Sequence, residues 1–218
     1  MLEQNKKELE TLTKELKFSA QQAEQFSKYI HLLEQWNQRT NLISRNDVSS
    51  IVSKHIRESL QILSFNILNG KKNILDLGTG AGFPGIPISI LNTHLDIALV
   101  DSKKIKTLFL QEVVDTLNLY HVRVICQRIE DLKDVDYIQK YDVILARAVS
   151  QLKDLWLWSE PLLQQEGVLV SYKGGDIDKE INELEKNCTN IELEIYPFQG
   201  PGGQENKKLV VATRQVIL

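Results

Sequence analysis

The sequence predicts an α/β protein in which a seven-stranded sheet, parallel except at its end, follows an N-terminal helical extension. Three observations lead to this fold class. Apolar residues recur at three- and four-residue steps up to about residue 68, and short apolar runs alternate with helical patterns from Lys72 onward. The last two apolar runs have no helical pattern between them. We therefore expect a helical extension over residues 1–68 and a sheet domain over residues 69–218.

In the extension, the spacing of the apolar residues predicts helices with one apolar face. Three leucines between residues 9 and 16 form the first apolar stripe. Ser19 is a suitable N-cap for a second helix that runs to about Trp36. The segment 51–63 again gathers its apolar residues on one side of a helix. Residues 1–68 are thus expected to be entirely helical.

The rest of the chain alternates between two patterns. The expected strands are Asn73–Leu77, Asp96–Val100, Val122–Cys126, Asp142–Ala146, Gly167–Tyr172, Ile191–Tyr196 and Lys208–Thr213. The expected helices are 84–91, 103–118, 150–164 and 176–188. Strands that alternate with helices predict a parallel sheet covered on both faces. The last two strands are joined by Gly200-Pro201-Gly202-Gly203, which predicts a closing antiparallel hairpin.

Composition and charge narrow the classes of protein. The chain is 42% hydrophobic and 25% charged, as globular proteins are, and no stretch approaches the roughly 20 apolar residues of a membrane span. We expect no signal peptide, since the N-terminus is charged. Cys126 and Cys188 lack partners at metal-ligand spacing, so we expect no metal site and a cytoplasmic location. With a net charge of −3, RNA binding would require basic residues gathered on one face.

A glycine-rich loop, Gly78-Thr79-Gly80-Ala81-Gly82-Phe83, follows the first strand. Its glycines permit positive φ and leave room for a ligand against the backbone, beyond the carboxyl ends of the strands. Pro84 and Pro87 suit the first turn of the next helix. Asp101 ends the second strand about twenty residues later, where a carboxylate can accept hydrogen bonds from both ribose hydroxyls of an adenine nucleoside. Together these features predict a nucleoside cofactor site.

The spacing of the glycines indicates which cofactor binds. Dinucleotide-binding folds use Gly-x-Gly-x-x-Gly, whereas this loop reads Gly-x-Gly-x-Gly and is preceded by Asp76. A negative charge there disfavours a pyrophosphate and suits the cationic sulfonium and amino groups of S-adenosylmethionine (SAM). We expect Asp76, Thr79 and Phe83 at the cofactor site with the three glycines. A loop that only packs, and an Asp101 that only caps the next helix, are the alternatives.

Several segments carry a resemblance to a known family: LDLGTGAGFPGIPISI, LVDSKKIKTLFL, ARAV and SYKGG, with NLISRND and KHIRESL upstream. They resemble the bacterial small-subunit rRNA guanine-N7 methyltransferases, also called glucose-inhibited division protein B, over most of residues 36–213. The resemblance implies a SAM-dependent methyltransferase domain (Rossmann-like) over residues 69–218. It also implies methyl transfer to N7 of a guanosine in the 530 loop of 16S rRNA, in the small ribosomal subunit.

The resemblance also implies roles for individual residues. Gly78, Gly80 and Gly82 would line the cofactor, Asp101 would hold its ribose, and Ile129 and Glu130 would flank its adenine. The positions with basic residues beside the target, which we expect to be catalytic, are Arg128, Arg147 and Lys173. His55 and Ser59 match an upstream histidine-containing motif.

Some positions depart from the family pattern. Lys54 and Lys208 stand where the family usually has arginine, Glu58 where it has aspartate, and Ile105-Lys106 where it has Lys-Arg. Replacing arginine by lysine loses bidentate phosphate contacts, and Ile105 is excluded from any substrate role.

The implied reaction suits these residues. N7 of guanine carries a free lone pair, so its methylation needs alignment rather than a general base. No Asn/Asp-Pro-Pro-aromatic motif follows the fourth strand, and Arg147 stands there instead. We expect Arg147 at the cofactor and at a phosphate or O6 of the target, because contact with N7 would block the attack.

Each of these side chains could instead have a purely structural role. Arg128 and Arg147 could form surface ion pairs, and His55 could pack in the core. The lysines at 103, 104 and 106 could contact phosphates or form a solvated helix face. The three tryptophans, Trp36, Trp156 and Trp158, are expected to pack rather than to stack on bases.

Other functions also remain open. The chain could be a SAM-dependent methyltransferase acting on another RNA, a small molecule or a protein, an NAD-linked oxidoreductase, or a non-catalytic RNA-binding protein. The glycine spacing argues against the second class, and the intact loop with Asp101 against the third. Nothing in the sequence demands more than a monomer.

Overall fold

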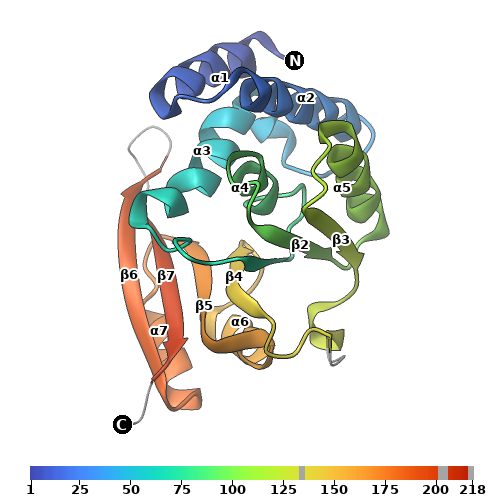
Figure 1. Ribbon diagram of the computed structural model, residues 1–218. Helices are drawn as coiled ribbons and strands as arrows, with labels where there is room; N and C mark the ends of the chain where they lie inside the picture. Colours follow the sequence, from blue (N-terminus) through green and yellow to red (C-terminus); the bar gives the residue numbers. More distant parts are fainter. Residues whose placement is uncertain (133–135, 201–205, 216–218) are drawn as a thin grey trace.

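The computed structural model describes residues 1–132, 136–200 and 206–215, and within them one sheet forms the centre of the molecule (Figure 1). Its strand order is β3-β2-β1-β4-β5-β7-β6. The strands are β1 (Asn73–Leu77), β2 (Asp96–Asp101), β3 (Val122–Cys126), β4 (Tyr141–Arg147), β5 (Leu163–Gly174), β6 (Ile191–Gln199) and β7 (Asn206–Arg214). β1 to β5 are parallel, whereas β7 runs antiparallel to both β5 and β6. The predicted fold class is confirmed.

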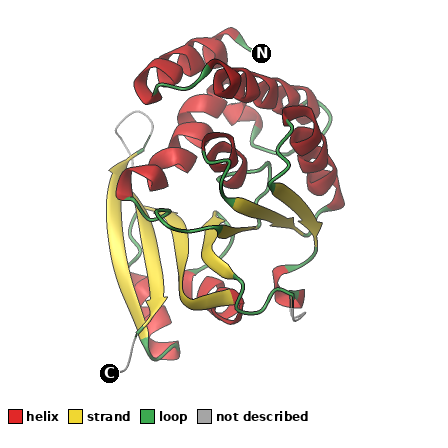
Figure 2. Ribbon diagram, in the orientation of Figure 1, coloured by secondary structure: helices red, strands yellow, loops and turns green. Residues whose placement is uncertain are grey.

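Helices cover both faces of this sheet (Figure 2). They are α1 (Glu3–Leu16), α2 (Ala20–Asn37), α3 (Arg57–Ser59), α4 (Gly85–Leu91), α5 (Lys104–Leu117), α6 (Leu152–Ser159) and α7 (Asp178–Asn187). Short helical turns flank α3 at Arg45–Ser50, Val52–Ile56 and Leu60–Phe65. α4 and α5 pack between one face of the sheet and α2, while α6 and α7 pack together on the other face.

The inner strands are buried on both faces. Ile74 of β1 belongs to the apolar cluster shared with the N-terminal helices, and its neighbour Leu75 belongs to the cluster shared with α6 and α7. Ile97 and Ala98 of β2 divide in the same way. Because successive side chains of a strand point to opposite faces, a strand covered on both sides must be apolar throughout. This explains the continuous apolar runs of the sequence.

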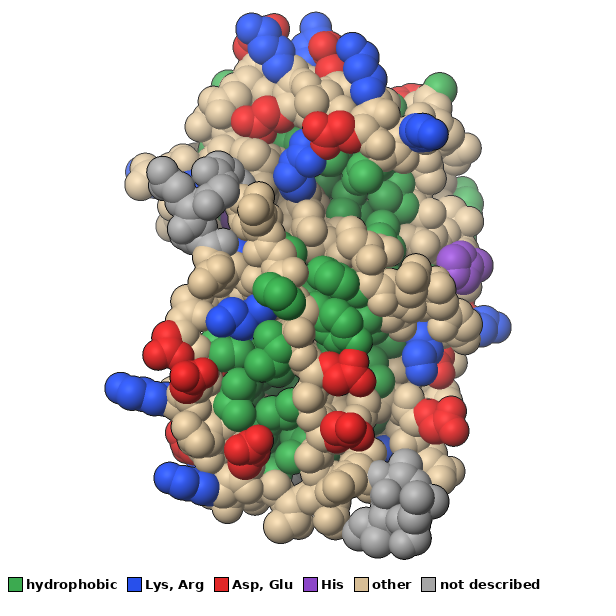
Figure 3. Space-filling view, turned by 90° about the vertical axis from the view of Figure 1, so that its left-hand side faces the viewer, with side chains coloured by type: hydrophobic (Ala, Val, Ile, Leu, Met, Phe, Trp, Pro, Cys, Tyr) green, Lys and Arg blue, Asp and Glu red, His purple; other side chains and the backbone are tan. Residues whose placement is uncertain are grey.

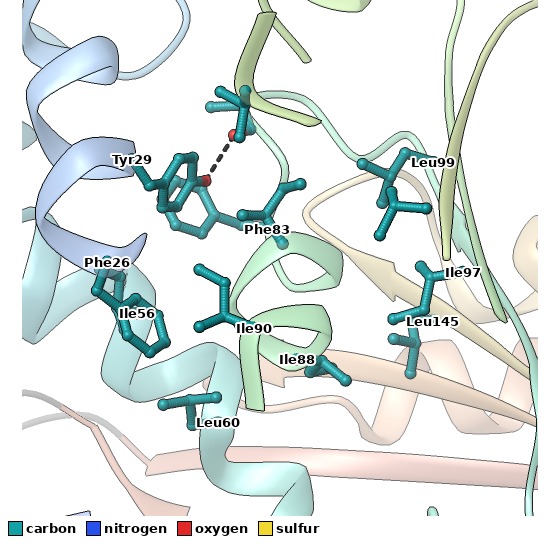
Figure 4. Close-up of a cluster of buried hydrophobic side chains, with 14 of the residues drawn as sticks. Phe26, Tyr29, Ile56, Leu60, Phe83, Ile88, Ile90, Ile97, Leu99 and Leu145 are labelled. Carbon is teal, nitrogen blue, oxygen red and sulfur yellow. Dashed lines mark hydrogen bonds between the residues drawn. The ribbon is translucent and has the colours of Figure 1, made fainter. Parts of the chain in front are cut away.

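The N-terminal helices share the core of the sheet (Figure 4). Phe26 and Tyr29 of α2 and Leu60 of the extension lie in one buried cluster with Leu145 of β4. The Tyr29 hydroxyl donates a 2.6 Å hydrogen bond to the carbonyl of Ala81, inside the glycine loop. The extension is therefore packed directly against the loop. The domain boundary near residue 69 stays a prediction.

Two details of the extension can be compared with the sequence. Ser19 is the N-cap of α2, as predicted, and forms a capping box in which its hydroxyl accepts from the Gln22 N–H. Residues 38–44, however, form turns rather than helix, and the prediction of an entirely helical extension is wrong there. The Asn37 side chain accepts hydrogen bonds from the N–H groups of Leu42 and Ile43, and so competes with continued helix formation.

The main correction in the sheet concerns β5. The helix predicted over 150–164 ends at Ser159, and β5 begins at Leu163 rather than at Gly167. Polar residues at 164–166 hide the start of this strand in the sequence, and a register shift against β4 near Tyr141 accommodates the extra residues. Residues 201–203 of the predicted hairpin loop lie outside the described residues, but the strands that flank it are antiparallel as expected.

The two edges of the described sheet are strands β3 and β6, and the β6 edge belongs to the antiparallel pair. Figure 3 views this side, where hydrophobic side chains gather in the middle of the face with charged ones around them. Ile195 is 46% exposed there, and the rings of Phe65 and Tyr196 pack 5.1 Å apart. Pro197 lacks an N–H, and β6 also carries two glutamates, features that blunt an edge against pairing with another strand.

The structure also describes the two cysteines, the side chains that could bind a metal, and the length and polarity of the helices. Cys126 is exposed, Cys188 is buried, and both are free thiols. In the described ranges, no cluster of three or more His, Cys, Asp or Glu side chains is arranged to hold a metal. No helix in these ranges is both long enough and apolar enough to span a membrane.

Candidate active site

The glycine loop turns the chain from β1 into α4, and its glycines have different tasks. Gly78, Gly80 and Gly82 have φ angles of 63°, 63° and 98°, which favour glycine. A Cβ at Gly82 would lie 2.6 Å from a side-chain carbon of Ile86, so packing excludes one. At Gly80 the nearest such atom is the Lys106 ammonium, 3.8 Å away. Gly82 therefore shapes the loop, whereas Gly80 leaves space beside it.

Asp76 braces the loop from behind. It is fully buried, and its Oδ2 accepts hydrogen bonds from the Thr79 hydroxyl at 2.6 Å and the Gly85 N–H at 2.8 Å. Burial raises the pKa of Asp76 to about 7, although these two hydrogen bonds act in the opposite direction. Its Oδ1 has no hydrogen-bond partner among the described residues. The structure thus places Asp76 and Thr79 beneath the loop surface.

Asp101 joins the loop to the next helix. Its carboxylate is nearly buried at the end of β2, with 5% of the residue exposed. Oδ1 accepts from the Lys103 N–H at 2.9 Å, at the start of α5. Oδ2 accepts from the Gly80 N–H at 3.1 Å and from the Lys106 ammonium at 3.0 Å. Asp101 therefore fixes the loop and the turn before α5, but it does not cap that helix, whose N-cap is Lys103 with no side-chain cap hydrogen bond. Its role at the ribose stays a prediction.

A hollow of about 270 Å³ opens beside Asp101, and we call it the loop hollow. Its lining residues come from the ends of four parallel strands and from the segments that follow them. They are Gly78, Asp101, Ser102, Lys103, Lys106, Gln127, Arg128, Ile129, Glu130, Ala148, Val149 and Trp158. Of the predicted cofactor residues, Gly78, Asp101, Ile129 and Glu130 line this hollow, whereas Gly80 does not line it and Gly82 and Phe83 are buried within the loop.

A second hollow, of about 510 Å³, adjoins the first, and we call it the arginine hollow. Its lining residues are Asp47, Lys54, His55, Glu58, Arg147, Ala148, Tyr172, Lys173, Gly174 and Lys207. Ala148 lines both hollows and has a φ of 56°, which is uncommon for a residue other than glycine. Four lysine and arginine side chains face two carboxylates in this described lining, so the arginine hollow is basic although the chain is acidic overall.

Arg147, at the end of β4, is held by three neighbours. Its guanidinium carbon lies 5.0 Å from the centre of the Phe83 ring, within the range of a cation–π contact. One terminal nitrogen is 2.9 Å from Nδ1 of His55, and the other is 3.8 Å from a carboxylate oxygen of Glu58. The His55 ring also stacks on Phe83, with centroids 4.9 Å apart and planes at 23°. Two segments distant in sequence thus fix one guanidinium.

The protonation of His55 follows from this contact. Burial, assisted by the charge of Arg147, lowers the pKa of His55 to about 4, and the charge of Asp47 only partly opposes this shift. Because arginine can only donate, Nδ1 of His55 must accept, and the proton of the neutral ring is on Nε2. Nε2 lies 3.9 Å from the Asp47 carboxylate, and with a neutral ring this contact is not an ion pair.

Lys173 is also held in place. Its ammonium donates to the Ser150 carbonyl at 2.8 Å and to Glu180 of α7 at 2.6 Å. Arg147 and Lys173 therefore share the arginine hollow, whereas Arg128 is exposed and lines the loop hollow instead. The structure brings together two of the three residues expected to be catalytic.

The structure also adds residues that sequence reasoning missed. Lys207 lines the arginine hollow, 3.7 Å from Glu58, whereas Lys208 donates to the Gly175 carbonyl. Asp47 lines the same hollow. β7 pairs with β5 in a register that places Lys207 opposite Gly174. This register is not visible in the sequence, because it is set only when the sheet forms.

The remaining candidates mostly pack. Trp36 contacts the Phe109 ring edge-on and donates from Nε1 to Glu112. Trp156 is buried, whereas Trp158 lines the loop hollow. The Ser59 hydroxyl, also buried, donates to the carbonyl of His55. Lys104 is exposed, as expected of a lysine on a solvated helix face, whereas Lys106 contacts Asp101.

A parallel sheet that ends in an antiparallel pair, with a glycine loop after β1 and a carboxylate at the end of β2, defines a SAM-dependent methyltransferase. Solved structures share this fold. They include a SAM-dependent methyltransferase from Aquifex aeolicus, with a TM-score of 0.58 and 15% identity over 75% of this chain and 92% of that one. Another is the glycopeptide N-methyltransferase MtfA complexed with SAM, with a TM-score of 0.60 and 9% identity over 74% of this chain and 95% of that one.

The chain belongs to the GidB family, described as rRNA small subunit methyltransferase G, whose family model matches residues 22–209. A protein from Desulforamulus reducens named ribosomal RNA small subunit methyltransferase G is 36% identical, over 93% of this chain and 87% of its own length. A protein of the same name from Thermoanaerobacter pseudethanolicus is also 36% identical, over 79% of this chain and 72% of its own length. The resemblance noted in the sequence is confirmed.

The loop hollow fits the cofactor of this class. Asp101 presents a carboxylate at its rim, and the backbone at Gly80 has open space beside it. Ile129 adds an apolar side chain next to the polar Glu130, a combination suited to the faces and edges of an adenine ring. These residues thus offer the carboxylates, the open backbone and the apolar side chain that suit a nucleoside.

Proposed function

We propose that this enzyme methylates N7 of a guanosine in the 530 loop of 16S rRNA, with SAM as the methyl donor. The observation that carries the proposal is the arginine hollow, a basic cavity that adjoins the loop hollow at Ala148. A base that enters the arginine hollow would lie next to the cofactor site. The names of the relatives support rRNA as the substrate.

The predicted cofactor residues in and around the loop hollow have the following proposed tasks. Asp101 accepts hydrogen bonds from the ribose hydroxyls, in exchange for its contact with Lys106. Gly78 and Gly80 let the ligand approach the backbone, and Ile129 and Glu130 flank the adenine. The residues that shape the loop from beneath are Asp76, Thr79, Gly82 and Phe83. When bound, SAM supplies an electrophilic methyl group on a positively charged sulfur.

The arginine hollow suits a target nitrogen that needs no deprotonation. Nδ1 of His55 already accepts a hydrogen bond from Arg147, so its lone pair is not available as a general base. N7 of guanine has a free lone pair and requires none. Methylation leaves a positive charge on the ring, and the carboxylates of Asp47 and Glu58 line the same cavity. Catalysis then depends on the alignment of the base.

The basic residues hold the RNA. Arg147 contacts a phosphate or O6 of the target at the border with the cofactor, and Lys173 reinforces the same wall. Arg128 contacts the RNA or the cofactor from the exposed rim of the loop hollow. Of these, Arg147 contributes most, because its guanidinium is fixed by three neighbours before any substrate arrives.

The proposal extends to partner and location. The substrate belongs to the small ribosomal subunit, so the enzyme acts in the cytoplasm. The proposal also includes a monomeric enzyme, as expected from the sequence.

The test is transfer of a labelled methyl group from SAM to unmethylated small subunits and, separately, to naked 16S rRNA. We expect label in 7-methylguanosine from the 530-loop fragment, and none with the Asp101→Ala variant. Label in another nucleoside or fragment would redirect the proposal to another RNA. SAM binding without transfer to either RNA would favour the alternative of a small-molecule substrate.

A further inference from the structure

We infer that His55 is a positioning residue, which holds the Arg147 guanidinium in the orientation that the target base requires. The inference rests on the proposed function and assigns the N-terminal extension a part in the reaction. The contact that carries it is the 2.9 Å hydrogen bond between Arg147 and Nδ1 of His55, two residues 92 positions apart in the chain. Arg147 otherwise meets a ring face and a carboxylate at 3.8 Å, and neither fixes its rotation as a short hydrogen bond does.

The geometry favours a positioning role over direct contact with the substrate. The Nε2 atom of His55 is buried, with the Asp47 carboxylate 3.9 Å away, so its proton is not exposed on the wall of the arginine hollow. Nδ1 is occupied by Arg147. One edge of the ring therefore faces Arg147, and its face is covered by Phe83. What remains for this histidine is to orient its partner.

The charged groups around His55 keep it an acceptor. Arg147, Lys54 and Lys207 disfavour a positive charge on the ring, and the carboxylate of Asp47 alone favours it. Burial acts in the same direction as the three cations. A neutral ring accepts from the guanidinium, whereas a protonated ring would repel it. The surroundings thus maintain the form of His55 that the hydrogen bond needs.

Phe83 connects this arrangement to the cofactor loop. Its ring contacts both the His55 ring and the Arg147 guanidinium, and it also packs 5.6 Å from the Tyr29 ring of α2. The extension, the glycine loop and the end of β4 therefore meet at one aromatic side chain. The orientation of Arg147 is set by the same packing that sets the loop.

The experiment compares two replacements of His55. His55→Phe retains a ring that can stack on Phe83 but removes the acceptor. His55→Asn removes the ring but places an acceptor, Oδ1, the same number of bonds from Cα as Nδ1. We expect kcat for rRNA methylation to fall about tenfold or more in His55→Phe and to recover a large part of that loss in His55→Asn. KM for RNA and the Kd for SAM should change less than threefold in both.

A double-mutant cycle separates positioning from packing. In an Arg147→Ala background, His55→Phe should lower kcat by less than twofold, because the residue that it orients is already gone. His94→Phe, an exposed site outside both hollows, is the matched control for a histidine-to-phenylalanine change. Glu58→Gln weakens the second polar contact of Arg147 at a partly exposed position, and we expect a smaller fall in kcat.

The outcomes are distinct. Equal losses in His55→Phe and His55→Asn, or additive losses in the cycle, would overturn the positioning role. If His55→Phe does not fold, as judged by its melting temperature and SAM affinity, His55→Asn and Glu58→Gln decide the matter through their coupling to Arg147→Ala. If the wild-type enzyme transfers no methyl group to rRNA, the proposed function fails first, whatever the variants do.

Discussion

The loop hollow and the arginine hollow meet at Ala148, but the chain builds them differently. The loop hollow takes its lining from residues 78–158, where four parallel strands end at the same edge of the sheet. The arginine hollow takes one wall from Asp47, Lys54, His55 and Glu58 of the extension and the other from β4, β5 and β7. The first is a product of sheet topology, and the second exists only where the extension docks.

This difference separates two kinds of recognition. Sheets of this class bind a nucleoside at the strand ends, so the loop hollow can be shared by many methyltransferases. The arginine hollow needs the extension, whose docking depends on buried contacts such as the hydrogen bond from Tyr29 to Ala81 and that from Tyr172 to Ser59. We therefore expect cofactor affinity and target turnover to respond to different substitutions.

The largest expected effect is on the loop hollow. Asp101→Ala removes a carboxylate that we expect to accept hydrogen bonds from two ribose hydroxyls. Each hydrogen bond to a charged group contributes about 1.5–3 kcal/mol to the free energy of binding. SAM affinity measured by calorimetry should fall about 100-fold or more. Asp96→Ala, at the exposed opposite end of the same strand, is the control and should bind SAM normally. Equal SAM affinity in Asp101→Ala and wild type would show that the cofactor binds elsewhere.

The next effect concerns the loop that supports this hollow. Gly82→Ala combines a left-handed φ with contacts of 2.6 Å to Ile86 and 3.0 Å to Leu110, so the free energy of unfolding should fall by about 3 kcal/mol. Gly80→Ala meets no atom closer than 3.8 Å, and only the backbone strain of about 1–2 kcal/mol remains. Urea denaturation of both variants measures the difference. Equal losses of stability would mean that packing does not distinguish the two glycines.

The third effect is confined to the arginine hollow. Arg147→Lys keeps the charge but loses the planar group that lies on Phe83 and donates to His55. We expect kcat for RNA methylation to fall roughly tenfold, or about 1.4 kcal/mol, with the Kd for SAM unchanged. Steady-state kinetics and SAM titration test this together. A parallel fall in SAM affinity would contradict the separation of the two hollows.

The smallest effect is the pH dependence of stability in the unsubstituted enzyme, because the two regions contribute to it with opposite sign. The pKa of His55 falls from 6.5 to about 4 on folding, so the unfolded chain takes up a proton first as the pH drops, and stability decreases from pH 6.5 toward 4. The pKa of Asp76 rises from 3.8 to about 7, so the unfolded chain loses its proton first as the pH rises, and stability decreases from pH 4 toward 7.

These opposing contributions can be separated by substitution. His55→Asn leaves the contribution of Asp76, so the unfolding free energy should fall with rising pH, by at most about 1.4 kcal/mol per pH unit. Asp76→Asn leaves the contribution of His55, so the unfolding free energy of this variant should rise with pH over the same range. Urea denaturation between pH 4.5 and 6.5 gives both slopes. Slopes of the same sign in the two variants would contradict the assignment.

The sequence predicted what depends on local pattern. The strand that ends in Asp101, the glycine loop and the antiparallel end of the sheet all follow from residues close together in the chain. His55 and Arg147 could be matched to a family, but their contact could not be derived, because 92 residues separate them. Lys207 was missed because two adjacent lysines look alike until β7 pairs with β5. The start of β5 was missed because polar residues interrupt its apolar pattern.

The shared core has a consequence for the synthesis of the protein. Tyr29 packs against Phe83 and Phe109, which leave the ribosome well after α2 does. At about 5–20 residues per second, Tyr29 waits roughly 4–16 s for Phe109 to be translated. During that time the apolar face of α2 has no sheet domain to cover it. The helices that are made first are therefore among the last parts of the molecule to complete their packing.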